Sequence, residues 1–255
     1  MAVVEVFFET AGEGEPVVLL NGVMMTTQSW VFQTRRLSES HRVVLHDFRG
    51  QLRTPFVGPI AMEDHVGDLA ALLDRLGIES AHVAGTSYGG EVGMLFALAH
   101  PERVRTLSLI ACASHVEPPL REAVTRWRDT PPEDLYDVTA PYNFSPDFLT
   151  PALLEAGSSR LRACPPEFFN GFRALCDAFL RLDITDRLHE ITAPILVMCG
   201  ALDVLKPPHY SEILASRIPN ARLEIVEGAG HAVFLEKHEE VTGKLLAFMG
   251  RQTRG

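Results

Sequence analysis

The stretch Gly85-Thr86-Ser87-Tyr88-Gly89 predicts a sharp turn from a strand to a helix. The apolar run 81–84 precedes it, and residues 91–99 have a helical pattern. At such a turn the serine backbone is strained, and we expect glycine at both ends because side chains there would collide with the neighbouring strand or helix. The pattern therefore predicts an exposed, nucleophilic Ser87 hydroxyl. A Gly-rich loop that caps a helix is the alternative interpretation.

Two later loops carry the partners that a serine nucleophile needs, a base and an orienting acid. The apolar run 195–199 leads into a loop with Asp203, and the run 223–226 leads into a Gly-rich loop with His231. The chain order of serine, acid and histidine is the order that nucleophile-elbow hydrolases use. We expect Ser87 to attack a carbonyl carbon and His231 to accept its proton. Asp203 would hold the second ring nitrogen of the histidine.

Two further motifs give the chain a family resemblance. Residues 17–22, Val-Val-Leu-Leu-Asn-Gly, are similar to the strand ending in His-Gly of the α/β-hydrolases, and residues 47–50, Asp-Phe-Arg-Gly, resemble the Asp-x-Arg-Gly turn of that family. Together with Ser87, Asp203 and His231, these motifs make nearly the whole chain resemble an α/β-hydrolase. The resemblance implies an α/β fold with a mostly parallel twisted sheet, helices on both faces and a helical cap insertion.

Apolar runs and helical patterns alternate along the chain, which is typical of a parallel sheet covered on both faces. We expect strands at residues 3–8, 17–20, 42–46, 81–86, 104–112, 195–199 and 222–226. We expect helices at residues 28–38, 63–76, 91–100, 207–217 and 238–249. Sites in such sheets form beyond the carboxyl ends of the strands, where the three predicted catalytic residues fall.

The long stretch between the fifth and sixth predicted strands does not continue this alternation. It is rich in proline and in short helical patterns with phenylalanine, and a connection of that length needs structure of its own. The resemblance implies a cap there, so we expect a helical insertion at 114–187 and a core domain made of 1–113 and 188–255. Helical spacing favours a role in holding the cap together for most of its phenylalanines.

The resemblance also locates the oxyanion hole and the substrate pocket. It implies that the backbone N–H groups of Val23 and Tyr88 bind the oxyanion. Asn21 stands where the family more usually has histidine, and residues 24–30 resemble an Asn-Gly variant found in acyl-transferring members. The expected substrate-binding candidates are Asn21, Met24, Met25, Trp30, His115, Phe144 and Phe172.

Other assignments of the acid and the base stay open at this point. Glu117 follows the preceding strand, where some family members place the acid. Asp203 could instead form an Asx-type turn, and His231 could be a packed loop histidine. We interpret His115 and His209 as cap or entrance residues.

Composition restricts the class of protein further. The chain has 255 residues, 46% of them hydrophobic, and a formal net charge of −10, which argues against a surface for nucleic acid or anionic membranes. No stretch of the length needed for a membrane span appears, and the start lacks a basic signal-peptide region, so we expect a cytoplasmic protein without membrane insertion. The four cysteines have no zinc spacing. We expect neither a metal nor another cofactor.

These features together predict a serine hydrolase. Its substrate would be a small-molecule carboxylic ester, thioester or lactone, cleaved through an acyl-enzyme intermediate. An acyltransferase that uses the same acyl-enzyme is the nearest alternative, and a non-catalytic ligand-binding member of the fold is another. No oligomeric state is predicted.

Overall fold

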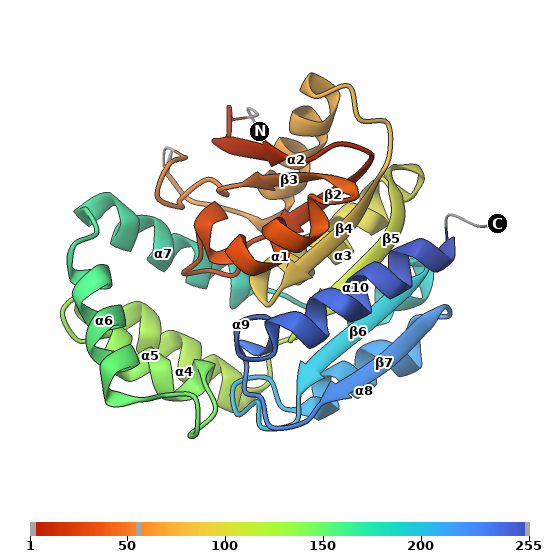
Figure 1. The fold of residues 1–255 in the computed structure, drawn as a ribbon. Coiled ribbons are helices and arrows are strands. Elements are labelled where there is room, and N and C mark those ends of the chain that lie inside the picture. The colour runs from red at the N-terminus through yellow and green to blue at the C-terminus, as the bar shows by residue number, and fades with distance from the viewer. Residues whose placement is uncertain (1–3, 55–57, 253–255) are drawn as a thin grey trace.

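The computed structural model describes residues 4–54 and 58–252, and within them a seven-stranded sheet forms the centre of the molecule (Figure 1). Its strand order is β1-β3-β2-β4-β5-β6-β7. Strand β1 pairs antiparallel with β3, and the other strand pairs are parallel. The strands are β1 (Phe8–Ala11), β2 (Glu15–Leu20), β3 (His41–His46), β4 (Ala81–Thr86), β5 (Val104–Ile110), β6 (Ile195–Gly200) and β7 (Ala221–Val226). The predicted mostly parallel α/β fold is confirmed.

Helices cover both faces of this sheet, in agreement with the prediction (Figure 1). One face carries α1 (Val31–Leu37), α9 (Val233–Glu236) and α10 (His238–Gln252). The other carries α2 (Met62–Arg75), α3 (Tyr88–Ala99) and α8 (Pro208–Arg217). Short 3-10 helices lie at η1 (Thr27–Trp30), η2 (Pro101–Arg103) and η3 (Thr185–Glu190).

Strand β2 illustrates why the apolar runs form central strands. Val17 and Leu19 are buried among the side chains of α1, α9 and α10, whereas Val18 and Leu20 are buried in the core on the opposite face. Successive side chains of a strand point to opposite faces, so a strand that is covered on both sides must be apolar throughout. All six residues of β4 and of β6 are buried for the same reason.

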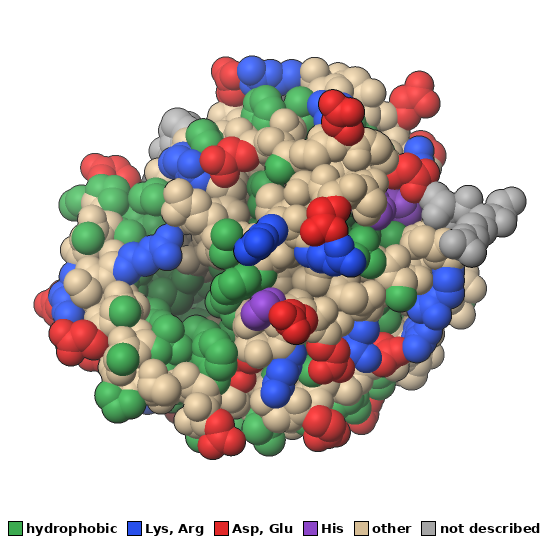
Figure 2. Space-filling view, in the orientation of Figure 1, with side chains coloured by type: hydrophobic (Ala, Val, Ile, Leu, Met, Phe, Trp, Pro, Cys, Tyr) green, Lys and Arg blue, Asp and Glu red, His purple; other side chains and the backbone are tan. Residues whose placement is uncertain are grey.

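Between β5 and β6 the chain forms four α-helices outside the strand-helix alternation, and we refer to this four-helix segment as the insertion. They are α4 (Pro118–Asp129), α5 (Leu135–Asn143), α6 (Pro151–Arg162) and α7 (Pro166–Phe179). The two ends of this segment lie side by side, because His115 forms a β-bridge with Asp183 and the Ile184 N–H donates to the Ser114 carbonyl at 2.9 Å. Figure 2 shows a hollow with hydrophobic side chains beside these helices.

The first strand differs from its prediction at residues 3–8, because β1 spans Phe8–Ala11; residue 3 lies outside the described residues. The apolar run before β1 is anchored by side chains instead. The Val4 N–H donates to Asp68 of α2, and the Phe7 N–H donates to Thr54. Backbone pairing at this edge starts with the Phe7 carbonyl, which accepts from the Asp47 N–H at 3.0 Å. Side-chain hydrophobicity does not report such edge pairing.

Two general features concern the membrane and the cysteines. No helix in the described part of the chain is long and apolar enough to cross a membrane. All four cysteines are free thiols, and three of them are buried. Burial raises the pKa of the Cys112 and Cys176 thiols, so these cysteines pack as small apolar side chains.

Candidate active site

Ser87 lies between β4 and α3 with a strained backbone. Its φ is 50° and its ψ is −123°, a region that residues with a side chain rarely adopt. The Ser87 N–H donates to the Ile110 carbonyl of β5 at 2.8 Å, and the Ser87 carbonyl accepts from the Gly90 N–H at 2.8 Å. These bonds hold the side chain at the start of α3.

The two glycines of the turn are required by close backbone contacts. A Cβ atom on Gly85 would lie 2.4 Å from the carbonyl carbon of Gly89, and one on Gly89 would lie 2.2 Å from the Leu20 carbonyl oxygen of β2. Contacts under 3.0 Å are essentially never seen for real Cβ atoms. The helix can therefore approach the sheet this closely only because both positions lack a side chain.

Asp203 and His231 follow the adjacent strands β6 and β7 and form a buried hydrogen bond. His231 Nδ1 donates to Asp203 Oδ2 at 2.7 Å, and both side chains are almost fully buried. The other oxygen, Oδ1, accepts from the backbone N–H groups of Leu205 and Lys206 at 2.9 and 2.8 Å. The aspartate thus makes the Asx-type turn and binds the histidine at the same time.

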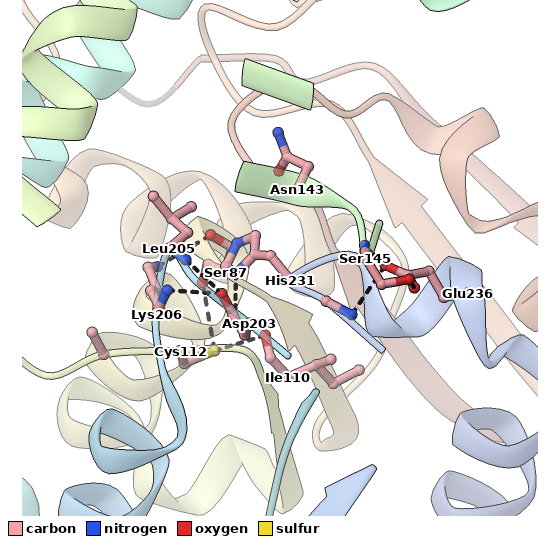
Figure 3. A network of polar contacts seen from close by, with 12 residues as sticks. Ser87, Ile110, Cys112, Asn143, Ser145, Asp203, Leu205, Lys206, His231 and Glu236 are labelled. Atoms are coloured by element: carbon pink, nitrogen blue, oxygen red, sulfur yellow. Dashed lines mark hydrogen bonds and ion pairs between the residues drawn. The ribbon is translucent and has the colours of Figure 1, made fainter. Parts of the chain in front are cut away.

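Hydrogen bonds from the helical insertion fix the loop that carries His231 (Figure 3). The Gly230 N–H donates to Glu236 Oε1 at 3.1 Å, and the same carboxylate accepts from the Ser145 N–H and hydroxyl. The Ala232 N–H donates to the Asn143 carbonyl at the end of α5 at 2.7 Å. The position of His231 therefore depends on the insertion as well as on the core.

The Ser87 hydroxyl has an unexpected partner. Lys206 Nζ donates to Ser87 Oγ at 3.1 Å and forms an ion pair with Glu91 Oε1 at 2.6 Å. Figure 3 places His231 beside Ser87, and within the described residues these two side chains form no hydrogen bond. Bonds between a nucleophile and its base commonly tighten only in the substrate complex.

A cavity beside Ser87 is small and mostly apolar. It is lined by Val23, Ser87, Tyr88, Leu120, Val124, Trp127, Cys176, Phe179, Leu205 and Lys206. The free volume of about 20 Å³ is on the order of one water molecule. The predicted oxyanion residues Val23 and Tyr88 both line this cavity. Tyr88 is the first residue of α3, where the backbone N–H has no acceptor within the helix.

Asn21 and Trp30 lie outside the lining of this cavity. Asn21 begins the loop after β2, two residues before Val23. The Asn21 amide donates to the His46 carbonyl and to Gln51 Oε1, each at 3.0 Å, and it accepts from Trp30 Nε1 at 3.0 Å. Gln51 Nε2 donates to the Gly22 carbonyl at 2.7 Å. Both candidates are fully buried, and their hydrogen bonds hold residues 21–22 against His46 and Gln51.

The other substrate-binding candidates also lie outside the lining of this cavity. Met24 packs on the core, while the Met25 sulfur accepts from the Gly22 N–H at 3.1 Å. Phe144 stacks on Phe148 in the insertion. Phe172 is buried in the core. Four phenylalanines of the insertion, Phe168, Phe169, Phe172 and Phe179, are buried in that core, and Phe179 also lines the cavity.

Glu117 forms hydrogen bonds with two other histidines. Its carboxylate accepts from His115 at 3.3 Å and from His209 at 3.1 Å, and Glu117 and His209 line a second cavity. Burial raises the pKa of the Glu117 carboxyl, but hydrogen bonds and charge from His209 and His115 outweigh it and lower the pKa. The two cavities share Leu120 and Leu205, so Glu117 lies near the site and apart from the His231–Asp203 pair.

A buried aromatic group lies under Tyr88. The Tyr88 hydroxyl is 2.9 Å from His65 Nε2. The rings of His46 and Tyr88 contact Phe48 edge-on. Burial lowers the pKa of His46 to about 4 and lowers the pKa of His65. His46 has no hydrogen-bond partner on either ring nitrogen among the described residues, so it is neutral at pH 7.

Sequence reasoning missed the Lys206–Glu91 pair and the insertion side chains at the cavity. Glu91 is the single charged residue in α3, one helical turn after Ser87. Lys206 follows Asp203 in the same loop. A carboxylate in an apolar helix and a lysine beside the predicted acid were the available signals. No group of three or more metal-ligating side chains occurs among residues 4–54 and 58–252.

Comparisons with known proteins agree with the observed fold. A family model described as alpha/beta hydrolase fold matches residues 15–238. The protein named "Putative carbamate hydrolase RutD" from Caulobacter sp. (strain K31) is 34% identical over 256 residues, covering 96% of this chain and 94% of that protein.

Two solved structures are similar over nearly their whole length. The enol-lactonase from Burkholderia xenovorans LB400 has a TM-score of 0.88 at 25% identity, covering 97% of both chains. A thermophilic esterase from Thermogutta terrifontis has a TM-score of 0.86 at 28% identity, covering 98% of this chain and 94% of that chain.

Proposed function

The chain belongs to the α/β-hydrolase family, and on that basis we propose that it is a serine hydrolase that cleaves a small carboxylic ester, thioester or lactone. One observation carries this proposal. Ser87 is held in a strained turn, and Lys206 connects it to the buried His231–Asp203 hydrogen bond of 2.7 Å, because Lys206 donates to Ser87 Oγ through its side chain and to the Asp203 carboxylate through its backbone N–H. The chemistry of these groups supports the proposal, because acyl transfer needs a hydroxyl as nucleophile, an imidazole as base and a carboxylate that orients the imidazole.

The proposed reaction proceeds in two steps. Ser87 Oγ attacks the carbonyl carbon while its proton passes to His231 Nε2, and the same proton then goes to the departing alcohol or thiol. The N–H groups of Val23 and Tyr88 stabilise the oxyanion. A water molecule next gives a proton to His231 and attacks the acyl-enzyme, which releases the acid and returns the proton to Ser87. Asp203 stabilises the imidazolium in both steps.

Hydrolysis of p-nitrophenyl esters and acyl thioesters of graded length tests the proposal. The native protein should hydrolyse the short members, and Ser87→Ala should lose this activity by several orders of magnitude. Equal rates for the two proteins would reject it. Product analysis with an added acceptor alcohol separates hydrolysis from acyl transfer, since a transferase forms the new ester in preference to the acid.

A carbamate is the second candidate substrate class. The 34% identity to a protein named as a carbamate hydrolase favours it, and a carbamate offers the same kind of carbonyl carbon to Ser87. A p-nitrophenyl carbamate and an ester of matched size would be compared in the same assay. Faster Ser87-dependent cleavage of the carbamate would select this class.

A further inference from the structure

Lys206 places a cation directly beside the proposed nucleophile. The lysine side chain is 2% exposed, and its Nζ contacts Ser87 Oγ at 3.1 Å, Glu91 Oε1 at 2.6 Å and the Phe179 ring at 4.6 Å from the centroid. An ammonium group has three protons to donate. A buried charge of this kind is costly unless it is paired, and nothing in the proposed acyl transfer itself requires it.

The charges around Lys206 favour a neutral ligand group. Glu91 already balances the ammonium, and Glu91 Oε2 has no hydrogen-bond partner among the described residues. Asp203 contributes a second carboxylate next to the Lys206 backbone. A substrate carboxylate at this position would add a third negative charge in an otherwise apolar, desolvated cavity. A carbonyl or hydroxyl oxygen would accept a hydrogen bond without that penalty.

Distance restricts where this oxygen can lie on the substrate. A carbonyl carbon poised for attack lies about 3 Å from Ser87 Oγ, and Lys206 Nζ lies 3.1 Å from the same atom. An acceptor on the second or third carbon of the acyl chain therefore reaches the ammonium while the scissile carbonyl faces Ser87. The small free volume of the cavity favours a short chain.

We infer that Lys206, held by Glu91, is a specificity residue for short acyl groups that carry an uncharged oxygen at carbon 2 or 3, such as 3-oxoacyl or 3-hydroxyacyl groups. This inference rests on the proposed serine hydrolase function. The ammonium donates a hydrogen bond to the substrate oxygen, while Glu91 fixes the position of the ammonium and supplies its countercharge.

Three N-acetylcysteamine thioesters test the inference because they share one leaving group. The butanoyl, 3-oxobutanoyl and malonyl thioesters differ at the position that Lys206 reaches, and the last two differ chiefly by a methyl group in place of a charged oxygen. Uncatalysed hydrolysis rates at the pH of the assay correct for intrinsic reactivity. The native protein should give the highest corrected kcat/KM with the 3-oxobutanoyl thioester.

Two variants assign the preference to the ion pair. Lys206→Met leaves Glu91 buried without its cation, so the double variant Lys206→Met/Glu91→Gln is measured as well, since it removes both charges. In either variant the ratio of kcat/KM for 3-oxobutanoyl over butanoyl should fall about 10- to 100-fold, the range for losing a hydrogen bond to a charged group. Lys244→Met/Glu224→Gln removes an ion pair of 2.9 Å between α10 and β7 and should keep the native ratio.

The outcomes separate the inference from the proposed function. If the native protein hydrolyses butanoyl and 3-oxobutanoyl thioesters equally well after correction, the inference fails while the hydrolase function stands. An equal loss on all three thioesters in the double variant also overturns it, because Lys206 would then act on Ser87 rather than on the acyl group. If no thioester or ester is cleaved in a Ser87-dependent manner, the proposed function itself fails.

Discussion

The Asp203 carboxylate lies 2.7 Å from His231 Nδ1 and is held there by two N–H groups of its own loop. One oxygen orients the imidazole while the other fixes the carboxylate. Asp203 therefore forms the turn of its own loop and orients the imidazole of His231 at the same time.

Asp203→Asn should lower kcat by about 10⁴-fold, because the amide stabilises the wrong imidazole tautomer and cannot stabilise the imidazolium. Stopped-flow acylation with a p-nitrophenyl ester measures the effect. Glu117→Gln is the control, since Glu117 binds His115 and His209, and it should retain most of the native rate. A large loss in Glu117→Gln with little loss in Asp203→Asn would transfer the acid role to Glu117.

Gly85→Ala should lower the free energy of unfolding by about 3 kcal/mol, the upper range for overpacking, because its Cβ would meet backbone atoms of Gly89 at 2.4 Å. Activity should fall with it as the turn is displaced. Gly67→Ala in α2 is the matched control, since nothing lies within 4 Å of its Cβ, and it should stabilise the protein by about 0.5–1 kcal/mol. Urea denaturation compares the two, and equal stabilities would contradict the packing argument.

The hydrogen-bond group around Asn21 should be essential for the loop that carries Val23. Asn21→Ala removes the buried hydrogen bonds of the amide to His46, Asp47, Gln51 and Trp30 and leaves Trp30 Nε1 without its acceptor, so we expect a loss of about 3 kcal/mol or more in unfolding free energy. Trp30→Phe removes one of these bonds and should cost about 1–2 kcal/mol. Thermal unfolding and ester turnover are measured together. Native turnover in folded Asn21→Ala would show that the loop keeps its position without the amide.

Stability should fall as the pH is lowered from about 6.5 to about 4. The pKa of His46 is about 4 in the folded state against the ordinary histidine value of 6.5, so in this window the unfolded chain binds a proton that the folded protein does not. The linked loss is about 3 kcal/mol. His65 acts in the same direction, since burial also lowers its pKa. In His46→Leu the slope of unfolding free energy against pH should flatten, and an unchanged slope would reject this assignment.

The features that can be predicted from the sequence are those that depend on local sequence patterns. Apolar runs give the parallel strands, and glycines 85 and 89 mark the turn because the backbone contacts there exclude side chains. The positions of Asp203 and His231 follow from strand ends that a parallel sheet brings to one edge. The prediction of a first strand at residues 3–8 is wrong, because the backbone N–H groups of Val4 and Phe7 donate to the side chains of Asp68 and Thr54 instead of to β3.

The remaining features depend on long-range packing. Glu91 and Lys206 are separated by 115 positions, and their pairing arises where α3 meets the loop after β6. The insertion helices contribute Trp127 and Phe179 to the cavity through their packing on the core. Asn21 was expected at the pocket on family resemblance, but burial beneath the loop turns its amide toward His46 and Gln51.

Intact-protein mass spectrometry after treatment with a fluorophosphonate tests the central claim most directly. The native protein should gain one adduct, peptide mapping should locate it at Ser87, and Ser87→Ala should gain none. His231→Ala should react far more slowly, because the hydroxyl loses its base. No adduct on the native protein, or equal labelling of Ser87→Ala, would contradict the assignment of Ser87 as the nucleophile.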